Sequence, residues 1–323
     1  MGASRVLLTG ATGFVGPRLL QKLKAGLFSD AEFLIWDFRP ETENPDPDTN
    51  IDICSSAAVA NSVAQFRPTH IIHLAAQSHV PTSFQRPELT WQINVMGTLH
   101  LFEAIKQYAP RAGVLYISTS EVYGRSFQSG KPLDENALLQ PQNPYAASKA
   151  AADLMAGQYA AQGLQVIRLR PFNHIGVGQR EEFVISAFAA QIARVEVGQQ
   201  EPVLLVGNLD ARRDFLEVDD VVSAYIKALE SADSLPPGLS LNICSGKSVS
   251  IREILDILLG QSNLSIRIES DPTRMRPSDT PVAVGCADAA QKILNWQALI
   301  PLEETLKSIL DDWRRIVSSL DKT

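Results

Sequence analysis

Short apolar runs alternate with longer amphipathic segments along the first 170 residues of the chain. The apolar runs, each typical of a buried strand, lie at residues 5–8, 33–36, 51–53, 70–75, 114–118 and 164–168. Apolar residues at helical spacing predict helices over residues 14–23, 57–66, 89–108 and 144–162. Such alternation is typical of a parallel sheet with helices on both faces and right-handed crossovers. We therefore predict an α/β fold built on a doubly wound parallel sheet.

This rhythm breaks after Pro171, where short strands and helices no longer alternate regularly. Strands are predicted at residues 203–206, 241–243 and 266–268, and helices at 183–197, 221–230, 251–259 and 302–317. We expect a larger domain over residues 1–170 and a smaller α/β lobe over residues 171–323. The pattern leaves open whether some segments of the second part return to the main sheet.

Composition and charge narrow the class of partner. The 323 residues are 45% hydrophobic and 20% charged, as in ordinary globular proteins, and the formal net charge is −7. An acidic surface argues against binding to nucleic acid or to an anionic membrane, because both require a positive face. We expect neither partner, although a local basic pocket for one phosphorylated metabolite stays compatible with this charge.

Cysteines and histidines suggest neither disulfides nor a metal centre. Cys54, Cys244 and Cys286 are widely spaced, as expected for buried thiols in a reducing cytoplasm. The start of the chain lacks the long apolar region of a signal peptide, and no apolar stretch approaches the ~18 residues that span a bilayer. The histidines nearest in sequence alternate between strand faces, so we expect no metal site.

A glycine-rich loop follows the first predicted strand and opens the first predicted helix. Gly10 suits a tight turn, Gly13 lets a diphosphate approach the backbone, and Gly16 lets the helix pack closely on the strand. The free N–H groups of the helix start, beside Phe14 and Val15, complete an anion site. This spacing in this context predicts a Rossmann-type site for NAD(H) or NADP(H).

Acidic residues at the next strand ends bear on which dinucleotide binds. Asp37 lies 21 positions after Gly16, close to the offset of a carboxylate that binds the adenosine ribose, and it favours NAD(H). Arg39 lies two positions later and would favour NADP(H) by pairing with the 2′-phosphate, so the preference stays open. Asp52 and Ile53, at the predicted third strand, are candidates to flank the adenine.

Tyr145 and Lys149 are four residues apart on a predicted helix and therefore share one face. An ammonium group beside a phenol is expected to lower the pKa of that phenol, so that it can exchange a proton with a carbonyl or hydroxyl group. Thr119 and Glu121 follow the fifth strand, at the edge where open α/β sheets bind ligands. Thr119 is a candidate to orient a substrate oxygen, and Glu121 a second candidate acid or base.

Taken together, these motifs resemble the extended short-chain dehydrogenases/reductases over essentially the full length of the chain. Residues 73–76 and 170–173 also match that family. The resemblance implies that Leu74, Ala75 and Ala76 line the cofactor site. It further implies that Phe172 lies beside the nicotinamide and Asn173 beside the substrate.

The second half resembles the enzymes of GDP-6-deoxyhexose synthesis, and most of all the GDP-4-keto-6-deoxy-D-mannose reductases. The matching segments lie at residues 172–179, 207–215, 242–246 and 276–279. The likeness implies reduction of the 4-keto group by NAD(P)H to give GDP-D-rhamnose, in a cytoplasmic homodimer. The residues leave open whether the product is rhamnose or its talose epimer. It also implies substrate contacts from these residues: Ser78, Ser120, Asn173, Arg213, Arg276 and Asp279. A glutamate is usual at the last position, so Asp279 is a departure.

Two other functions stay open at this stage. A GDP-mannose 4,6-dehydratase, or a related nucleotide-sugar epimerase, would use Glu121 with Thr119. The Arg-Arg-Gly segment of those dehydratases has no match at residues 178–182. A dinucleotide-sensing or RNA-binding protein on the same fold is disfavoured by the negative charge and by the presence of both Tyr145 and Lys149. For the dimer, which the likeness implies, the candidate surfaces are residues 312–317, the face of Leu99, Phe102 and Ile105, and the helix at residues 147–154. The apolar spacing is equally compatible with packing on the sheet.

Overall fold

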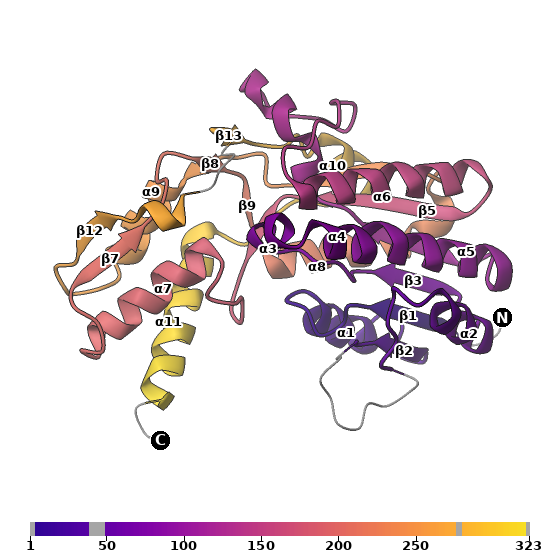
Figure 1. Cartoon of the computed structure of the whole chain (residues 1–323), viewed down its shortest axis with the longest axis horizontal. Helices are drawn as coiled ribbons and strands as arrows, with labels where there is room; N and C mark the ends of the chain where they lie inside the picture. Colours follow the sequence, from indigo (N-terminus) through magenta and orange to yellow (C-terminus); the bar gives the residue numbers. More distant parts are fainter. Residues whose placement is uncertain (1–3, 39–48, 276–279, 321–323) are drawn as a thin grey trace.

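A computed structural model describes residues 4–38, 49–275 and 280–320 of the chain (Figure 1). Its centre is a sheet of six parallel strands in the order β10-β5-β4-β3-β1-β2. The strands are β1 (Arg5–Thr9), β2 (Glu32–Trp36), β3 (His70–His73), β4 (Gly113–Ile117), β5 (Gln165–Pro171) and β10 (Ser240–Ile243). The predicted α/β class is confirmed. The strand order reverses at β1, so a ligand crevice is expected beyond the carboxyl ends of the strands.

Both faces of this sheet are buried under helices. In β1, Val6 and Leu8 belong to one apolar cluster and Leu7 to another, as alternation along a strand requires. The first cluster includes residues of α1 (Gly16–Ala25) and α8 (Val218–Glu230). The second includes residues of α2 (Ser56–Phe66), α5 (Thr98–Tyr108) and α6 (Pro144–Ala161). These two cores hold the strand ends in register beneath the ligand crevice.

The predicted strand at residues 51–53 is wrong, because this segment forms a turn before α2. The Asp52 side chain accepts a hydrogen bond from the Cys54 amide (2.9 Å), and the Asp52 carbonyl accepts one from Ser55 (2.9 Å). These local bonds compete with strand pairing, and three apolar residues offer little to offset them. Ile53 is nevertheless buried. The apolar pattern therefore predicted the burial of this residue correctly, but not its secondary structure.

The long helix predicted at residues 89–108 is continuous but not uniform. It comprises α4 (Pro87–Trp91), a π-helical segment η1 (Gln92–Gly97) and α5. In η1, Asn94 accepts a hydrogen bond from the Gln77 amide (2.8 Å) and donates to Ser148 of α6 (2.9 Å). The π-helical turn therefore ties the loop after β3 to the helix that carries Tyr145.

A second lobe, to the left in Figure 1, has its own apolar core. It is built mainly from α7 (Val184–Glu196), α9 (Ile251–Leu259) and α11 (Leu302–Leu320) around the strand pair β7 (Val203–Val206) and β12 (Arg267–Ser270). Elements from beyond residue 171 also occur in the first lobe, since β10 pairs with β5 and α8 packs on the main sheet. The domain boundary at residue 170 stays a prediction.

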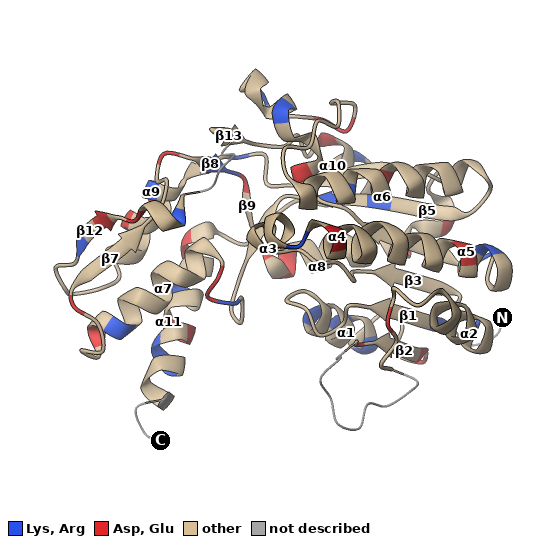
Figure 2. Cartoon of the chain, in the orientation of Figure 1, with Lys and Arg blue, Asp and Glu red and all other residues tan. Residues whose placement is uncertain are grey.

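Short elements connect the two lobes. The small sheets are β11 (Val249–Ser250) with β8 (Arg212–Arg213) and β13 (Val282–Ala283), and β6 (Asn173–Ile175) with β9 (Phe215–Glu217). The other helices are α3 (Val80–Gln85), α10 (Asp288–Leu294) and the 3-10 segments η2 (Ser120–Ser129), η3 (Ala232–Ser234) and η4 (Pro272–Arg274). Basic and acidic residues are interspersed along both lobes (Figure 2). In the described part of the chain, no helix combines the length and apolar character needed to cross a membrane.

Candidate active site

A cavity of about 1460 Å³ lies between the lobes, at the carboxyl ends of the parallel strands. It brings together the predicted residues that the structure describes: Gly10, Gly13, Phe14, Val15, Gly16, Asp37, Asp52, Ile53, Leu74, Ala75, Ala76, Ser78, Thr119, Ser120, Glu121, Tyr145, Lys149, Phe172, Asn173 and Arg213. Three further predicted residues, Arg39, Arg276 and Asp279, lie outside the described residues. Residues from Gly10 to Arg213, far apart in sequence, thus line one volume.

The glycine loop between β1 and α1 has the geometry of a diphosphate cradle. Gly10 adopts a positive φ of 71°, and a Cβ there would lie 2.7 Å from the Ala75 amide nitrogen. At Gly16, a Cβ would collide with the backbone of Ala11. Glycine is therefore required at both positions. Because α1 begins here with no acidic residue in its first turn, its free N–H groups favour an anion, and the loop fits a dinucleotide.

Asp37 lies at the end of β2, in the cavity, where a ribose carboxylate was predicted. Its side chain accepts a hydrogen bond from Thr12 of the glycine loop (2.5 Å), and its amide donates to the Thr49 carbonyl (2.8 Å). The carboxylate is thus positioned by the loop that receives the diphosphate. A fixed negative charge at this point suits ribose hydroxyls and repels a 2′-phosphate.

Tyr145 lies in the first turn of α6, which begins at a well-formed cap. The Asn143 side chain accepts a hydrogen bond from the Ala146 amide (2.7 Å), and Pro144 occupies the first helical position. The cap fixes Tyr145 opposite Thr119, with which its phenol is hydrogen-bonded. Burial raises the pKa of Tyr145 to about 12, although the Thr119 hydrogen bond acts to lower it. The phenol is consequently protonated at neutral pH.

The expectation that Lys149 lowers the pKa of Tyr145 is not met in this geometry. The Lys149 amine donates to the Ile117 carbonyl at the end of β4 (2.6 Å) and lies 4.6 Å from the centre of the Tyr116 ring. Burial lowers the pKa of Lys149 to about 8, while the negative charge of Asp153 acts to raise it. The two groups are one turn apart on α6, and burial is the largest cause of the pKa shift of each.

Asp153, one turn beyond Lys149, is a supporting residue that the sequence analysis missed. Its side chain is fully buried and forms ion pairs with Arg168 (2.9 Å) and Arg170 (3.0 Å) of β5. Both arginines act to lower the pKa of the carboxyl group, and the net direction is downward despite burial. The spacing of the tyrosine, the lysine and an acid at successive helical turns is the signal that could have found it.

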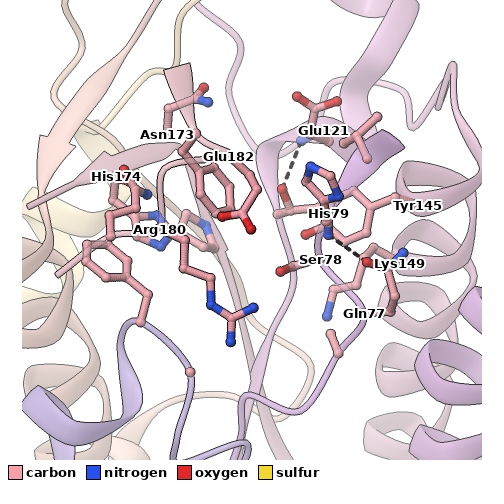
Figure 3. A pocket seen from close by; sticks show the side chains of 18 of the residues that line it. Gln77, Ser78, His79, Glu121, Tyr145, Lys149, Asn173, His174, Arg180 and Glu182 are labelled. Carbon is pink, nitrogen blue, oxygen red and sulfur yellow. Dashed lines mark hydrogen bonds between the residues drawn. The ribbon is translucent and has the colours of Figure 1, made fainter. Parts of the chain in front are cut away.

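Glu121 projects into the cavity from η2, near α6, the helix that carries Tyr145 and Lys149 (Figure 3). Its carboxylate accepts a hydrogen bond from the Asn143 side chain (3.2 Å), and its amide donates to the Thr119 hydroxyl (3.3 Å). Glu121 therefore belongs to the same hydrogen-bonded group as Thr119 and the start of α6. A second acid or base is available at this site.

On the opposite side of the cavity, Arg213 on β8 is held by the carbonyl groups of Arg212 (2.9 Å) and Thr280 (2.6 Å). The adjacent Asp214 is buried and accepts hydrogen bonds from the backbone of Gly246 and Gly285, among others. Burial raises the pKa of Asp214 to about 6 in spite of these donors. Asp214 joins three chain segments next to Arg213. The sequence analysis gave it no role, although it lies in the matching segment at residues 207–215.

Figure 3 places Asn173 and His174 on one side of the cavity, and Ser78, Tyr145 and Lys149 on the other. Several other lining residues were not predicted: Gln77, His79, Arg180 and Glu182. The His79 ring contacts the Phe183 ring edge-on across the cleft, with centroids 6.4 Å apart. These polar residues follow the segments at 73–76 and 170–173 along the chain, and that position could have indicated that they line the cavity.

The fold and this arrangement of residues define the class as NAD(P)-dependent enzymes of the extended short-chain dehydrogenase/reductase type. The chain belongs to the family described as GDP-mannose 4,6 dehydratase, whose model matches residues 7–309. It is 36% identical over 313 residues to the GDP-6-deoxy-D-mannose reductase of Pseudomonas aeruginosa, covering 96% of this chain and 97% of that protein.

Solved structures agree with this assignment. The structure of RMD from Pseudomonas aeruginosa complexed with NADPH is similar, with a TM-score of 0.85 and 35% identity over 97% of this chain and all of that one. The Thermus thermophilus UDP-glucose 4-epimerase complexed with NAD has a TM-score of 0.82 and 27% identity, covering 96% of this chain and 99% of that one. These similar chains hold either NADPH or NAD.

Proposed function

We propose that this protein reduces the 4-keto group of GDP-4-keto-6-deoxy-D-mannose to give GDP-D-rhamnose, with hydride from NAD(P)H. The observation that carries the proposal is the 36% identity to a GDP-6-deoxy-D-mannose reductase, which extends over nearly the whole of both chains. The cavity supports it because a dinucleotide cradle and a protonated tyrosine face the same volume.

The roles of the catalytic residues follow from their positions. When bound, the reduced dinucleotide supplies the hydride. Tyr145 donates the phenolic proton to the sugar oxygen as negative charge develops there, and Thr119 orients that oxygen by a hydrogen bond. Lys149, cationic at neutral pH, stabilises the phenolate left on Tyr145 and is within the same helical face for contact with a ribose. Each step uses a group that the fold already places at the end of β4 or the start of α6.

The binding roles are assigned by lobe. We assign the dinucleotide to residues of the first lobe and to Phe172, which follows β5. The residues of the first lobe are the glycine loop, Asp37, Asp52, Ile53 and residues 74–76. We assign the GDP-linked sugar to Ser78, Ser120, Asn173 and Arg213, joined by Arg276 and Asp279. Arginine suits a diphosphate because its planar fork donates two hydrogen bonds and keeps its charge.

A paired incubation tests the reaction type. The purified protein is supplied with GDP-4-keto-6-deoxy-D-mannose and NADH or NADPH, and separately with GDP-mannose alone. A reductase oxidises the dinucleotide in the first mixture and leaves GDP-mannose unchanged in the second. No oxidation of the dinucleotide in the first mixture, or conversion of GDP-mannose in the second, would contradict the proposal.

A GDP-mannose 4,6-dehydratase is the second candidate, and Glu121 is the observation that favours it. An acid or base beside Thr119 is what elimination of water from a sugar requires, and Glu121 occupies that place. A dehydratase regenerates its dinucleotide within one turnover and would retain it through purification. Conversion of GDP-mannose to its 4-keto-6-deoxy product would establish this alternative.

We further propose a cytoplasmic homodimer. Phe102 and Ile105 are fully buried in the second core, so the predicted face of α5 is wrong as a contact surface. Val317 in the predicted 312–317 segment is likewise buried. Leu154, in the predicted surface at residues 147–154 of α6, is exposed, and so is Trp91 of the adjacent α4. An apolar strip over α4 and α6 supports association of two copies.

A further inference from the structure

Arg180 lies between β6 and α7, and the sequence analysis gave it no role. Its side chain is exposed and lines the cavity between the lobes. Figure 3 shows it extending into the space between the Asn173 side and the Ser78 side of the cavity. The hydrogen bonds and ion pairs among the described residues leave its guanidinium group without a partner. A permanent charge is therefore free to meet a ligand.

Other basic residues that line the described part of the cavity are already engaged within the protein. Lys149 and Arg213 donate to backbone carbonyl groups. Arg274 forms an ion pair with Asp271 (3.2 Å). Arg180 differs from them because all the N–H groups of its guanidinium are available to a ligand in the cavity.

The segment that carries Arg180 is held against the glycine loop. The His174 ring stacks on the Phe14 ring, with centroids 6.1 Å apart and planes 8° apart. Arg18 of α1 donates to the Phe14 carbonyl (3.4 Å) and also to the Val177 carbonyl. These contacts tie residues 174–177 to the start of α1, so Arg180 enters the cavity close to the diphosphate cradle.

The cradle itself lacks a cation. Residues 10–16 contain no lysine or arginine, and Pro17 removes one N–H group from the start of α1. Arg18 uses its guanidinium group on carbonyl oxygens. A diphosphate on this loop would meet only N–H groups and the helix dipole from the first lobe. The first lobe therefore leaves room for a positive group from the other side of the cavity, and Arg180 lines that cavity.

We propose that Arg180 binds the diphosphate of the dinucleotide, so that the cofactor is held by both lobes. This inference rests on the dinucleotide use in the proposed function. The diphosphate of the GDP-sugar has the same chemistry and is the other possible ligand. Arg213 on β8 is the residue already assigned to it, so the cofactor is the better match for Arg180.

Ligand titrations of the full chain test the proposal without any turnover. Wild type, Arg180→Ala, Arg180→Lys and Arg111→Ala are titrated calorimetrically with NADPH, ADP-ribose and GDP at two salt concentrations. Arg111 is the control, because it is an exposed arginine preceding β4 at the opposite edge of the sheet. Thermal melting of each free variant verifies folding, and the exposed, unpartnered Arg180 side chain predicts no change there.

We expect Arg180→Ala to raise the Kd for NADPH and ADP-ribose by about tenfold and to weaken its salt dependence, as for loss of one charge-assisted contact. Arg180→Lys should fall between it and wild type, and Arg111→Ala should match wild type. The inference is overturned if Arg180→Ala binds NADPH like wild type, or loses affinity for GDP instead. If wild type itself binds neither NADPH nor ADP-ribose, the proposed function fails as well.

Discussion

Tyr145 and Lys149 lie one turn apart on α6, and burial moves their pKa values in opposite directions. The phenol becomes a weaker acid, and the amine loses its proton more readily. Both changes follow from the cost of a charge in a low-dielectric site. A protonated phenol is the form needed to donate to a carbonyl oxygen, whereas Lys149 still carries its charge at neutral pH. The pair is therefore poised for reduction.

Replacing Tyr145 by phenylalanine tests the proton donor. The change removes the hydroxyl group and keeps the ring, so folding should be preserved. We expect kcat for reduction to fall by about two to four orders of magnitude, the scale of a positioned acid. Single-turnover oxidation of the reduced dinucleotide measures this directly. A wild-type rate in Tyr145→Phe would exclude Tyr145 as the donor.

The lowered pKa of Lys149 predicts the pH dependence of reduction. The ammonium form is needed beside Tyr145 and is lost as pH rises through about 8. Thus kcat/KM should be constant near neutral pH and decline above pH about 8, since kcat/KM reports the free enzyme. Initial rates over a pH series, with stability checked at each pH, would show the decline. A profile that stays level far above pH 8 would contradict the assigned role.

Among the elements, β8 shows how a buried acid positions a functional side chain. Asp214 accepts hydrogen bonds from Ser245, Gly246 and Gly285, which follow β10 or lie close to β13. It thereby fixes the strand that carries Arg213. An isolated buried carboxylate would be destabilising, but four donors offset much of its desolvation.

Asp214→Asn should weaken both the fold and substrate binding. The amide group would face an N–H donor, and one buried donor lost costs about 1–3 kcal/mol in the free energy of unfolding. We expect a lower melting temperature and a higher KM for the GDP-sugar, with a smaller change in kcat. Asp210→Asn, an exposed acid on the preceding loop, is the control. Equal melting temperatures and KM values for the two variants would refute this role.

Helices and strands were predicted correctly where the hydrophobic periodicity agreed with residues that mark the start or end of an element. The helix of Tyr145 and Lys149 begins at Pro144 as the pattern indicated, because a proline and an asparagine cap mark its start. Prediction failed at residues 51–53, where side-chain hydrogen bonding decided the conformation. It also missed Asp214, because the partners of this carboxylate come from distant segments and no local spacing reveals them. Asp153 was missed although its helical spacing from Lys149 was available, because its ion pairs with β5 are tertiary contacts. Contacts of this kind exist only once the sheet is assembled.

Over the whole molecule, two lobes enclose the cavity. The order of the parallel strands determines where it lies, at their carboxyl ends. The sequence analysis assembled most of the lining residues because they follow strand ends, which converge at one edge of a parallel sheet. It could not place residues such as Arg180, which reach the cavity from a loop whose path depends on packing between lobes. The predicted contact surface on α5 failed for a related reason, since one helix face serves either a core or a partner.

The apolar strip over α4 and α6 predicts the state of association. Leu154 is 62% exposed at the centre of α6, where a charge should disrupt a dimer without disturbing the core. We expect light scattering to give a dimer mass for wild type and a monomer mass for Leu154→Glu. Leu299→Glu, at a similarly exposed leucine in the segment before α11, should remain dimeric. A monomeric wild type would contradict the proposed interface.

The central claim is that this protein reduces a GDP-linked 4-keto sugar. The most direct measurement is NMR of the sugar formed when the purified protein is given GDP-4-keto-6-deoxy-D-mannose with NADH or NADPH. We predict that the 4-keto signals disappear and that those of GDP-D-rhamnose replace them, with one mole of dinucleotide oxidised per mole of product. An unchanged keto sugar in the presence of both dinucleotides would contradict the account.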